Sequence, residues 1–251
     1  MTILIISGGC GRMGRSIATL ALQDSVFTIG AVLEAAGHEA IGRDYGTVLG
    51  RPAALGVKVG DNIEAALKQG EVLIEFTSPE VTVAHVQAAQ QARKPIVIGT
   101  TGLSDAQQAA LQSAAKTIPV VFSPNMSVGV NVLFELARTA AIRLGPGYDV
   151  EVVEAHHKHK KDAPSGTAKR LASVLADARK QPVSAIPVHP VRAGDIVGDH
   201  TVILAGPSER LELTHRAQSR DVFAQGALRA AQFAAKQRPG LYDMSHVLTG
   251  S

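Results

Sequence analysis

The chain has 251 residues, of which 45% are hydrophobic and 19% charged, and its formal net charge is +3 at pH 7. This composition excludes a disordered chain, and the length suffices for one large or two modest domains with a sizeable core. With no tryptophan and only 4% aromatic residues, base-stacking surfaces for nucleic acid are not expected. No apolar stretch is long enough to cross a membrane, and the single cysteine, Cys10, fits a reducing compartment, so we expect a cytoplasmic protein.

Five short apolar runs in the first half predict strands of a parallel sheet. They are continuous rather than alternating, as expected where both faces of a strand are buried. They cover residues 3–6, 26–33, 72–76, 95–98 and 120–122. Helical stretches lie between them, and the repeated strand–helix units predict a doubly wound, Rossmann-like α/β domain that binds ligands at the carboxyl ends of its strands.

Local signals refine this part of the chain. Asp61 with Glu64 and Ser104 with Gln107 have the spacing of helix capping boxes. The glycine-richer span 34–60 predicts a loop with at most a short strand.

The second half predicts a smaller α+β domain over residues 127–217. A helix over 127–144 is stopped by glycine and proline, and a strand over 148–155 and a helix starting near Thr167 follow. The stretches 200–205 and 210–216 alternate apolar and polar residues around a turn, as antiparallel strands with one wet face do. A final helix over 221–236 returns to the pattern of the first domain, so residues 218–251 are expected to complete the domain of residues 1–126.

A glycine-rich loop over residues 8–14 follows the first strand and opens a helix. Its Gly-x-x-Gly-x-x-Gly spacing lets the backbone approach a pyrophosphate, and the helix N-terminus supplies amides. Glu34 ends the second strand 20 positions after Gly14, where a carboxylate can accept hydrogen bonds from a ribose diol. A tight turn can use glycine for steric reasons alone, but the strand, helix and acid together favour a dinucleotide. Cys10 is interpreted as a small loop residue and not as a nucleophile.

The residue beside the acid bears on the choice of cofactor. Ala35 stands where an enzyme specific for the 2′-phosphate usually has arginine, and Glu34 alone would repel that phosphate. We therefore expect NADH, with NADPH as an alternative because Arg12 could serve a phosphate. The stretches Gly99–Gly102 and Ser123–Met126 follow predicted strands where a nicotinamide and its ribose would pass, although ordinary turns have similar compositions.

A basic segment, residues 156–161, consists only of histidine and lysine. A solvated loop, a metal site and a site for a phosphate backbone are alternatives, but the run lacks a nearby cysteine, a helical His-x-x-x-His pair and aromatic residues. Ser165-Gly166-Thr167 then opens a helix and forms an anion cradle of amides and hydroxyls. Together these groups indicate a site for a small carboxylated substrate that also needs a proton.

The run His-His-Lys-His-Lys-Lys-Asp-Ala-Pro-Ser-Gly-Thr at 156–167, after Glu154-Ala155, resembles the signature of the 4-hydroxy-tetrahydrodipicolinate reductase (dihydrodipicolinate reductase) family of diaminopimelate and lysine biosynthesis. The resemblance covers nearly the whole chain. It extends to residues 8–14, 99–102, 123–131, 191–200 and 220–226.

The resemblance implies NAD(P)H-dependent reduction of 4-hydroxy-tetrahydrodipicolinate, by way of dihydrodipicolinate, to tetrahydrodipicolinate, with no metal. His156 aligns with the catalytic acid/base and Lys160 with the proton-donating lysine of the family. The groups implied to hold the dicarboxylate are His157, Ser165, Gly166 and Thr167. The implied cofactor positions are Gly8, Gly9, Cys10, Gly11, Arg12, Met13, Glu34, Gly99, Thr100, Thr101, Ser123, Pro124, Asn125 and Met126.

The family architecture implies a dinucleotide-binding domain of residues 1–126, completed by 218–251, and a domain of residues 127–217 that binds substrate and forms a homotetramer. Because the two sets of site residues fall on different predicted domains, hydride transfer is expected to require domain closure. The chain departs from the family pattern between Arg179 and Pro190, where an Arg-Glu-Gly-type segment is usual and is absent here. This departure bears on the subunit interface more than on the chemistry.

Three other functions compete with this interpretation. A semialdehyde or homoserine dehydrogenase would share the layout, but an acylating semialdehyde enzyme needs a catalytic cysteine, and Cys10 is in the wrong loop. A non-catalytic dinucleotide sensor would keep the glycine loop without needing the basic segment, and a nucleic-acid-binding module is the least favoured. The remaining histidines, expected to be structural or at the surface, are His38, His85, His189, His215 and His246.

Overall fold

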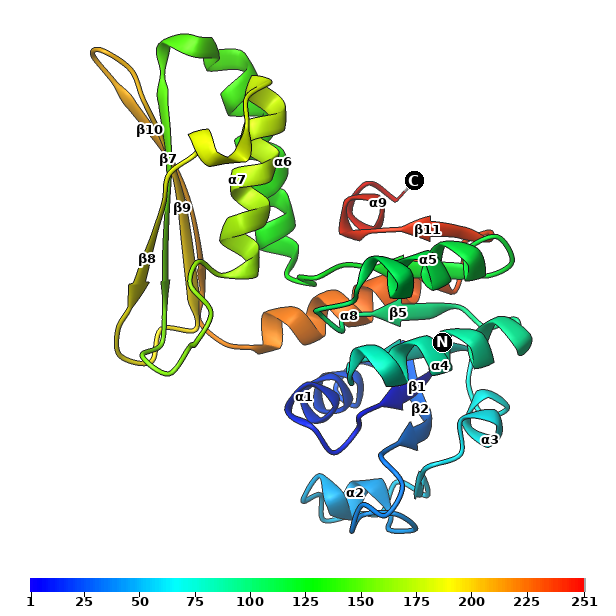
Figure 1. Ribbon diagram of the computed structural model, residues 1–251. Helices are drawn as coiled ribbons and strands as arrows, with labels where there is room; N and C mark the ends of the chain where they lie inside the picture. Colours follow the sequence, from blue (N-terminus) through cyan, green and yellow to red (C-terminus); the bar gives the residue numbers. More distant parts are fainter. Residues whose placement is uncertain (251) are drawn as a thin grey trace. The chain divides into compact units, whose positions relative to one another are not determined.

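The computed structural model describes residues 1–250, which form two compact units (Figure 1). Unit 1 comprises Met1–Met126 together with the chain from Phe223 onward, and unit 2 comprises Ser127–Val222. No helix within the described residues is both long and apolar enough to cross a membrane.

Unit 1 is built on a seven-stranded sheet in which every pairing is parallel. The strands are β1 (Thr2–Ser7), β2 (Phe27–Leu33), β3 (Val59–Gly60), β4 (Val72–Glu75), β5 (Ile96–Ile98), β6 (Pro119–Phe122) and β11 (Gly240–Tyr242). Their order is β11-β6-β5-β4-β1-β2-β3, so the predicted doubly wound α/β fold is confirmed. The strand order reverses between β1 and β4, which is where such sheets bind ligands.

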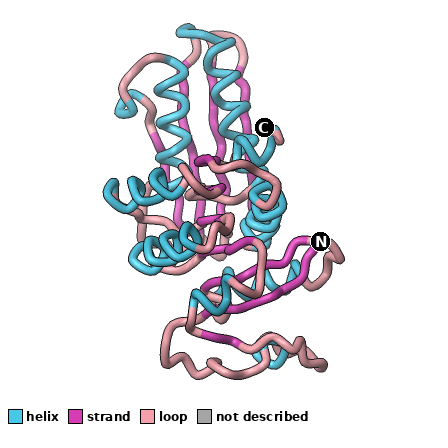
Figure 2. The backbone as a smooth tube through the Cα atoms, turned by 90° about the vertical axis from the view of Figure 1, so that its right-hand side faces the viewer, coloured by secondary structure: helices cyan, strands magenta, loops and turns pink. Residues whose placement is uncertain are grey.

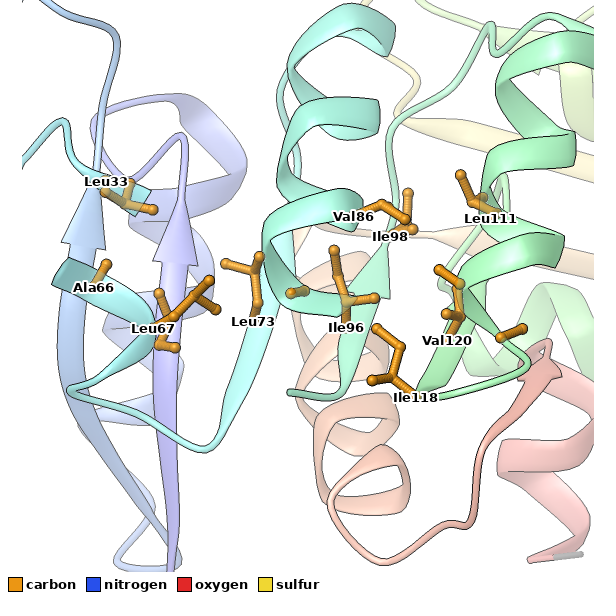
Figure 3. Close-up of a cluster of buried hydrophobic side chains, with 14 of the residues drawn as sticks. Leu33, Ala66, Leu67, Leu73, Val86, Ile96, Ile98, Leu111, Ile118 and Val120 are labelled. Carbon is orange, nitrogen blue, oxygen red and sulfur yellow. The ribbon is translucent and has the colours of Figure 1, made fainter. Parts of the chain in front are cut away.

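Helices cover the sheet of unit 1. They are α1 (Arg12–Ala21), α2 (Tyr45–Val48), α3 (Ile63–Leu67), α4 (Pro79–Gln91), α5 (Asp105–Ala114), α8 (Asp221–Ala234) and α9 (Met244–Thr249), with the start of α8 in unit 2. Figure 3 shows side chains of α3, α4 and α5, such as Leu67, Val86 and Leu111, beside Leu73 and Ile96 of the strands. These positions are at most 2% exposed. Burial of this apolar face stabilises the layer of helices on the sheet.

Two local predictions for unit 1 need correction, and one is confirmed. Asn62, and not Asp61, caps α3, because its side chain accepts a hydrogen bond from the Ala65 amide. The span 34–60 contains the short helix α2, capped by Asp44, in addition to β3. The capping box of Ser104 with Gln107 is present at the start of α5.

Unit 2 is a four-stranded mixed sheet with two long helices, and Figure 2 shows these helices side by side along the strands. The strands are β7 (Asp149–His156), β8 (Val188–Arg192), β9 (Gly198–Ala205) and β10 (Arg210–Ala217), and the helices are α6 (Val128–Leu144) and α7 (Gly166–Arg179). The predicted antiparallel pair is confirmed as β9 with β10. The buried positions of β7 alternate along the strand, and those nearest its start pack against α6 and α7.

Strand β8 was not predicted. Its sequence contains Pro190, which cannot donate a hydrogen bond to a sheet, and it shows no alternating burial. It occupies the edge of the sheet, where proline is tolerated, and pairs in parallel with β7. Because of this pairing, Arg192 lies opposite His156.

Candidate active site

The glycine-rich loop joins β1 to α1 at the carboxyl edge of the unit 1 sheet. Gly8 has a φ of +70°, a conformation that favours glycine, and a Cβ on Gly14 would lie 2.3 Å from the Gly8 carbonyl oxygen. Gly11 occupies the N-cap of α1 without a side-chain hydrogen bond to the helix. No N-cap side chain therefore binds the first amides of α1, and the loop fits a pyrophosphate group.

Tyr45, which the sequence analysis placed in a loop without a role, supports this turn from beneath. Its hydroxyl donates a hydrogen bond to the Gly9 carbonyl over 2.6 Å, and its side chain is fully buried. Burial raises the pKa of Tyr45 far above its usual value, so the hydroxyl stays a donor. No feature of the local sequence indicated this contact, because Tyr45 lies 36 positions from Gly9.

Glu34 lies directly after β2 and contacts the glycine loop. One carboxylate oxygen accepts from the Cys10 amide over 2.9 Å, and the other accepts from the Ala35 amide over 3.0 Å. Burial raises the pKa of the Cys10 thiol, and the negative charge of Glu34 raises it further, so the thiol is held protonated. Cys10, Glu34 and His38 offer ligand atoms that lie within 4.8 Å of one another. They form a group that could hold a metal ion, but it uses the carboxylate that a dinucleotide ribose would need.

The other two expected cofactor segments also follow strands of the same sheet. Thr100 is 4% exposed, and its hydroxyl oxygen accepts hydrogen bonds from the Thr77 amide and the Thr82 hydroxyl. The Ser123 hydroxyl donates to the Asn125 carbonyl over 2.9 Å and folds the turn after β6. Because all strands are parallel, these segments, the glycine loop and Glu34 lie at one edge of the sheet.

In unit 2, His156 and Glu154 form a buried pair on β7. Nδ1 of His156 lies 2.5 Å from Oε2 of Glu154, whose side chain is fully buried. A carboxylate can only accept, so Nδ1 carries the proton and Nε2 is the basic nitrogen of the neutral ring. From the sequence, Glu154 was considered as a strand end and, with Asp162, as a possible metal ligand, but not as the partner of His156, although a charged residue at an inward-facing strand position is itself a signal.

Arg192 of β8 also hydrogen bonds to Glu154. Its Nη1 and Nη2 each donate to a different oxygen of Glu154 over 2.8 Å, and the Ser165 amide donates to Oε1 over 3.0 Å. Burial by itself would raise the pKa of Glu154, but the hydrogen bonds from Arg192, His156 and Ser165 outweigh burial and lower it. Glu154 therefore stays ionised beneath the imidazole.

The titration of His156 follows from its burial. Loss of solvent lowers its pKa, the positive charges of Lys160 and Arg192 lower it further, and the contact with Glu154 only partly offsets them. The free imidazole is thus neutral near pH 7 and accepts a proton more readily when negative charge is bound nearby.

Ser165 and His200 connect this pair to helix α7. Ser165 caps the helix by accepting from the Ala168 amide, so its hydroxyl proton is left to be donated to His200 Nε2, 3.2 Å away. The His200 ring lies edge-on to His156, with centroids 5.2 Å apart. Burial, followed by the charge of His156, lowers the pKa of His200 to about 4. His200 is therefore a neutral neighbour of His156, a role that was not expected from the sequence.

The remaining predicted substrate residues lie in the loop between β7 and α7. Lys160 Nζ is paired with Asp162 over 2.8 Å, and its side chain is 23% exposed. The His157 ring lies 6.4 Å from that of His159. Gly166 and Thr167 form the first turn of α7. The basic segment is thus followed within unit 2 by the N-terminal end of α7, a kind of helix end that favours anions.

Comparison with known proteins identifies close relatives. The family model described as "Dihydrodipicolinate reductase, N-terminus" matches residues 2–126, and that described as "Dihydrodipicolinate reductase, C-terminus" matches residues 129–248. A 4-hydroxy-tetrahydrodipicolinate reductase of Anaeromyxobacter dehalogenans is 47% identical, over 99% of this chain and 98% of the relative. One of Thiobacillus denitrificans is also 47% identical, over 97% of each chain.

Solved structures agree. A dipicolinate-bound dihydrodipicolinate reductase from Paenisporosarcina sp. TG-14 superposes with a TM-score of 0.82 at 25% identity, covering 97% of each chain. An amine dehydrogenase from Mycobacterium smegmatis has a TM-score of 0.63 at 12% identity, over 96% of this chain and 94% of that one, and shares the fold alone.

Proposed function

The chain belongs to the dihydrodipicolinate reductase family, and on that basis we propose that it reduces 4-hydroxy-tetrahydrodipicolinate, by way of dihydrodipicolinate, to tetrahydrodipicolinate. The observation that carries the proposal is the buried Glu154–His156 pair beside the helix end at Ser165. It combines a proton-transfer group with an anion-binding site, and reduction of a dicarboxylated imine needs both.

The proton comes from His156, assisted by Lys160. When a hydride adds to one carbon of the conjugated cyclic imine, an electron pair moves to a neighbouring atom, which must then take up a proton. The dianionic substrate favours protonation of His156, and Glu154 stabilises the resulting imidazolium through Nδ1. The proton leaves from Nε2, and such transfer typically contributes about 10²–10⁴ in rate. Lys160 supplies a second positive charge and proton source on the same loop.

The dicarboxylate is held by the first turn of α7. The amides of Gly166 and Thr167 belong to the N-terminal turn of the helix, where N–H groups and the helix dipole favour an anion. His157 precedes this turn in the basic segment and adds a donor. Because Ser165 is anchored by His200 on one side and Glu154 on the other, the cradle is preorganised before substrate binds.

Unit 1 binds the reduced nicotinamide dinucleotide, which supplies the hydride when bound. Its pyrophosphate would be held by Gly8–Met13 and its adenosine ribose by Glu34, whose carboxylate is fixed by the Cys10 and Ala35 amides. Gly99–Thr101 and Ser123–Met126 would hold the nicotinamide half. Because Glu34 repels a 2′-phosphate and Ala35 cannot bind one, the cofactor preference is for NADH, with NADPH accepted less well.

The active form is a homotetramer assembled through unit 2. Helices α6 and α7 pack on one face of its sheet, and the opposite face is half-exposed at positions such as Val153 and Ile203. This face also carries Glu151 and Glu212, the register partners of Ile203, and a mixed polar and apolar surface of this kind suits association with a second copy. Cys10 as the single thiol fits a reducing compartment, so we place the reaction in the cytoplasm.

One assay tests the proposal. Purified protein is mixed with freshly generated 4-hydroxy-tetrahydrodipicolinate, and oxidation of NADH and of NADPH is followed separately. We expect turnover with both and kcat/KM for NADH at least equal to that for NADPH.

His156→Ala should lose at least about tenfold in kcat while binding NADH as the parent does. No turnover in the parent would reject the function, a tenfold preference for NADPH would reject the role of Glu34 and Ala35, and parental turnover in the variant would remove His156 from the mechanism. Light scattering of the same sample measures the mass of the oligomer.

A further inference from the structure

A buried carboxylate–imidazole pair lies in unit 1, outside the residues assigned to cofactor or substrate. Glu75 is the last residue of β4 and is fully buried, and its Oε2 lies 2.5 Å from Nδ1 of His85 on α4. His85 was expected to be a structural or surface histidine, yet its side chain is only 16% exposed. A buried charged group is costly unless it is paired, so its position in the fold needs a reason.

The pair is located where the strand order of the sheet reverses. Glu75 is the register partner of Ser7, the last residue of β1, and the Ser7 hydroxyl lies 3.2 Å from the same Nδ1 of His85. Ser7 immediately precedes the glycine-rich loop. The imidazole thus joins the ends of β1 and β4 at the point where doubly wound sheets bind their ligand.

Further hydrogen bonds extend from the pair to two more loops. The Thr77 hydroxyl donates to Oε1 of Glu75, and the Thr77 amide donates to Thr100 Oγ1 over 3.2 Å. The buried hydroxyl of Thr82 on α4 donates to the same oxygen of Thr100 over 2.9 Å. The Gly99 amide donates to the Glu75 carbonyl over 3.0 Å.

The loops after β1 and β4 are also in close contact. A Cβ placed on Gly8 would lie 3.0 Å from the Phe76 carbonyl oxygen and 3.1 Å from Thr77 Cγ2. A shift of Thr77 therefore changes the space available to the glycine turn. Three loops that follow β1, β4 and β5 are held by one hydrogen-bond network, with Glu75 and His85 at its centre.

We propose that Glu75 and His85 are positioning residues for the dinucleotide: they hold the loops after β1, β4 and β5 in the arrangement that binds the reduced cofactor. They act through Ser7, Thr77 and Thr100 and do not themselves touch the cofactor. An apolar pair would join β4 to α4 equally well but would leave Thr77 and Ser7 without their partners. This inference rests on the proposed function, because it concerns the same cofactor.

The test measures the Kd for NADH and the separate KM values of Glu75→Gln and His85→Gln. Each substitution keeps the approximate size of the side chain and removes the hydrogen bond between carboxylate and imidazole. We expect the Kd and KM for NADH to rise about tenfold, while kcat at saturating NADH and KM for the dicarboxylate stay within about twofold of the parent. Glu80→Gln, an exposed position in the first turn of α4, is the matched control and should behave as the parent.

A second variant tests the same network if Glu75→Gln does not fold. Thr82→Val removes one buried hydroxyl of the network, retains the shape of the side chain, and should raise the Kd for NADH about threefold. An unchanged Kd for NADH in the folded variants would overturn the proposal, as would equal losses in both KM values, which indicate general destabilisation. If the parent binds neither NADH nor NADPH, the proposed function fails. If parent and variants bind alike, only the positioning role fails.

Discussion

Arg192 binds Glu154 through a bidentate ion pair, in which Nη1 and Nη2 each lie 2.8 Å from a different carboxylate oxygen. The two residues are 38 positions apart and meet because β8 pairs in parallel with β7. This ion pair keeps Glu154 charged in a buried position, and the charge in turn orients and stabilises the imidazole of His156.

Replacing Glu154 with glutamine should lower kcat by at least about tenfold and leave the Kd for NADH unchanged. The neutral amide cannot stabilise an imidazolium, and its NH2 group can turn His156 into the wrong tautomer. Steady-state kinetics at saturating NADH measure the effect. Glu151→Gln is the control. Glu151 also lies on β7 and also pairs with a histidine, His189 of β8, but both of these side chains are exposed. Equal kcat values for the two variants would contradict the role of Glu154.

Protein stability should fall as the pH is lowered from about 7 to 5. Because the pKa of His200 is about 4 in the folded chain and about 6.5 when unfolded, the unfolded state binds more protons in this range. The group therefore contributes stability that is present above pH 6.5 and is lost as the pH falls toward 4. The expected loss is about 2 kcal/mol between pH 7 and 5.

Urea unfolding of the parent and of His200→Gln at both pH values measures this loss. The variant should show a pH dependence weaker by about that amount than the parent does. Identical pH dependence in His200→Gln and the parent would show that His200 titrates normally in the folded chain.

Replacing Glu34 with glutamine should shift cofactor preference toward NADPH. The carboxylate that would repel a 2′-phosphate becomes a neutral amide, which can still hydrogen bond to a ribose. We expect the ratio of kcat/KM for NADPH to that for NADH to rise about tenfold. Glu39→Gln, an exposed acidic position in the same loop, should leave the ratio at the parental value. A ratio that does not respond to Glu34→Gln would mean that this carboxylate does not face the ribose.

Gly226→Ala should destabilise unit 1. A Cβ at this position of α8 would lie 1.7 Å from the Met126 carbonyl oxygen, so the helix or the turn after β6 must move. Overpacking of this kind typically costs about 1–3 kcal/mol, and the thermal unfolding midpoint should fall by several degrees. Gly147→Ala is the control, because a Cβ there meets no atom within 4 Å. Equal midpoints for the two variants would show that α8 has room to adjust.

Much of the fold is predictable because it depends on patterns of apolar and polar residues that are close together along the chain. The runs ending in Ile6, Ile98 and Phe122 are continuous and apolar, which identifies strands buried on both faces, and their alternation with helices allows few other folds. The glycine loop and the His156–Thr167 segment are also contiguous, so their chemistry is visible without coordinates. The short elements escaped prediction. Helix α2 has four residues and is stabilised by the burial of Tyr45 and by the Asp44 cap, whereas β8 contains a proline and is held by its pairing with β7.

By itself, the amino-acid order determined the strand–helix alternation, the glycine turn and the basic segment, because each depends on residues close together along the chain. Only the tertiary structure decided which distant groups contact these segments. Tyr45 hydrogen bonds to Gly9, Arg192 pairs with Glu154, and His85 contacts both Ser7 and Glu75. These partners come from separate elements, and their contacts depend on the register of parallel strands and the packing of helices. Neither property leaves a periodic signal in the neighbouring residues.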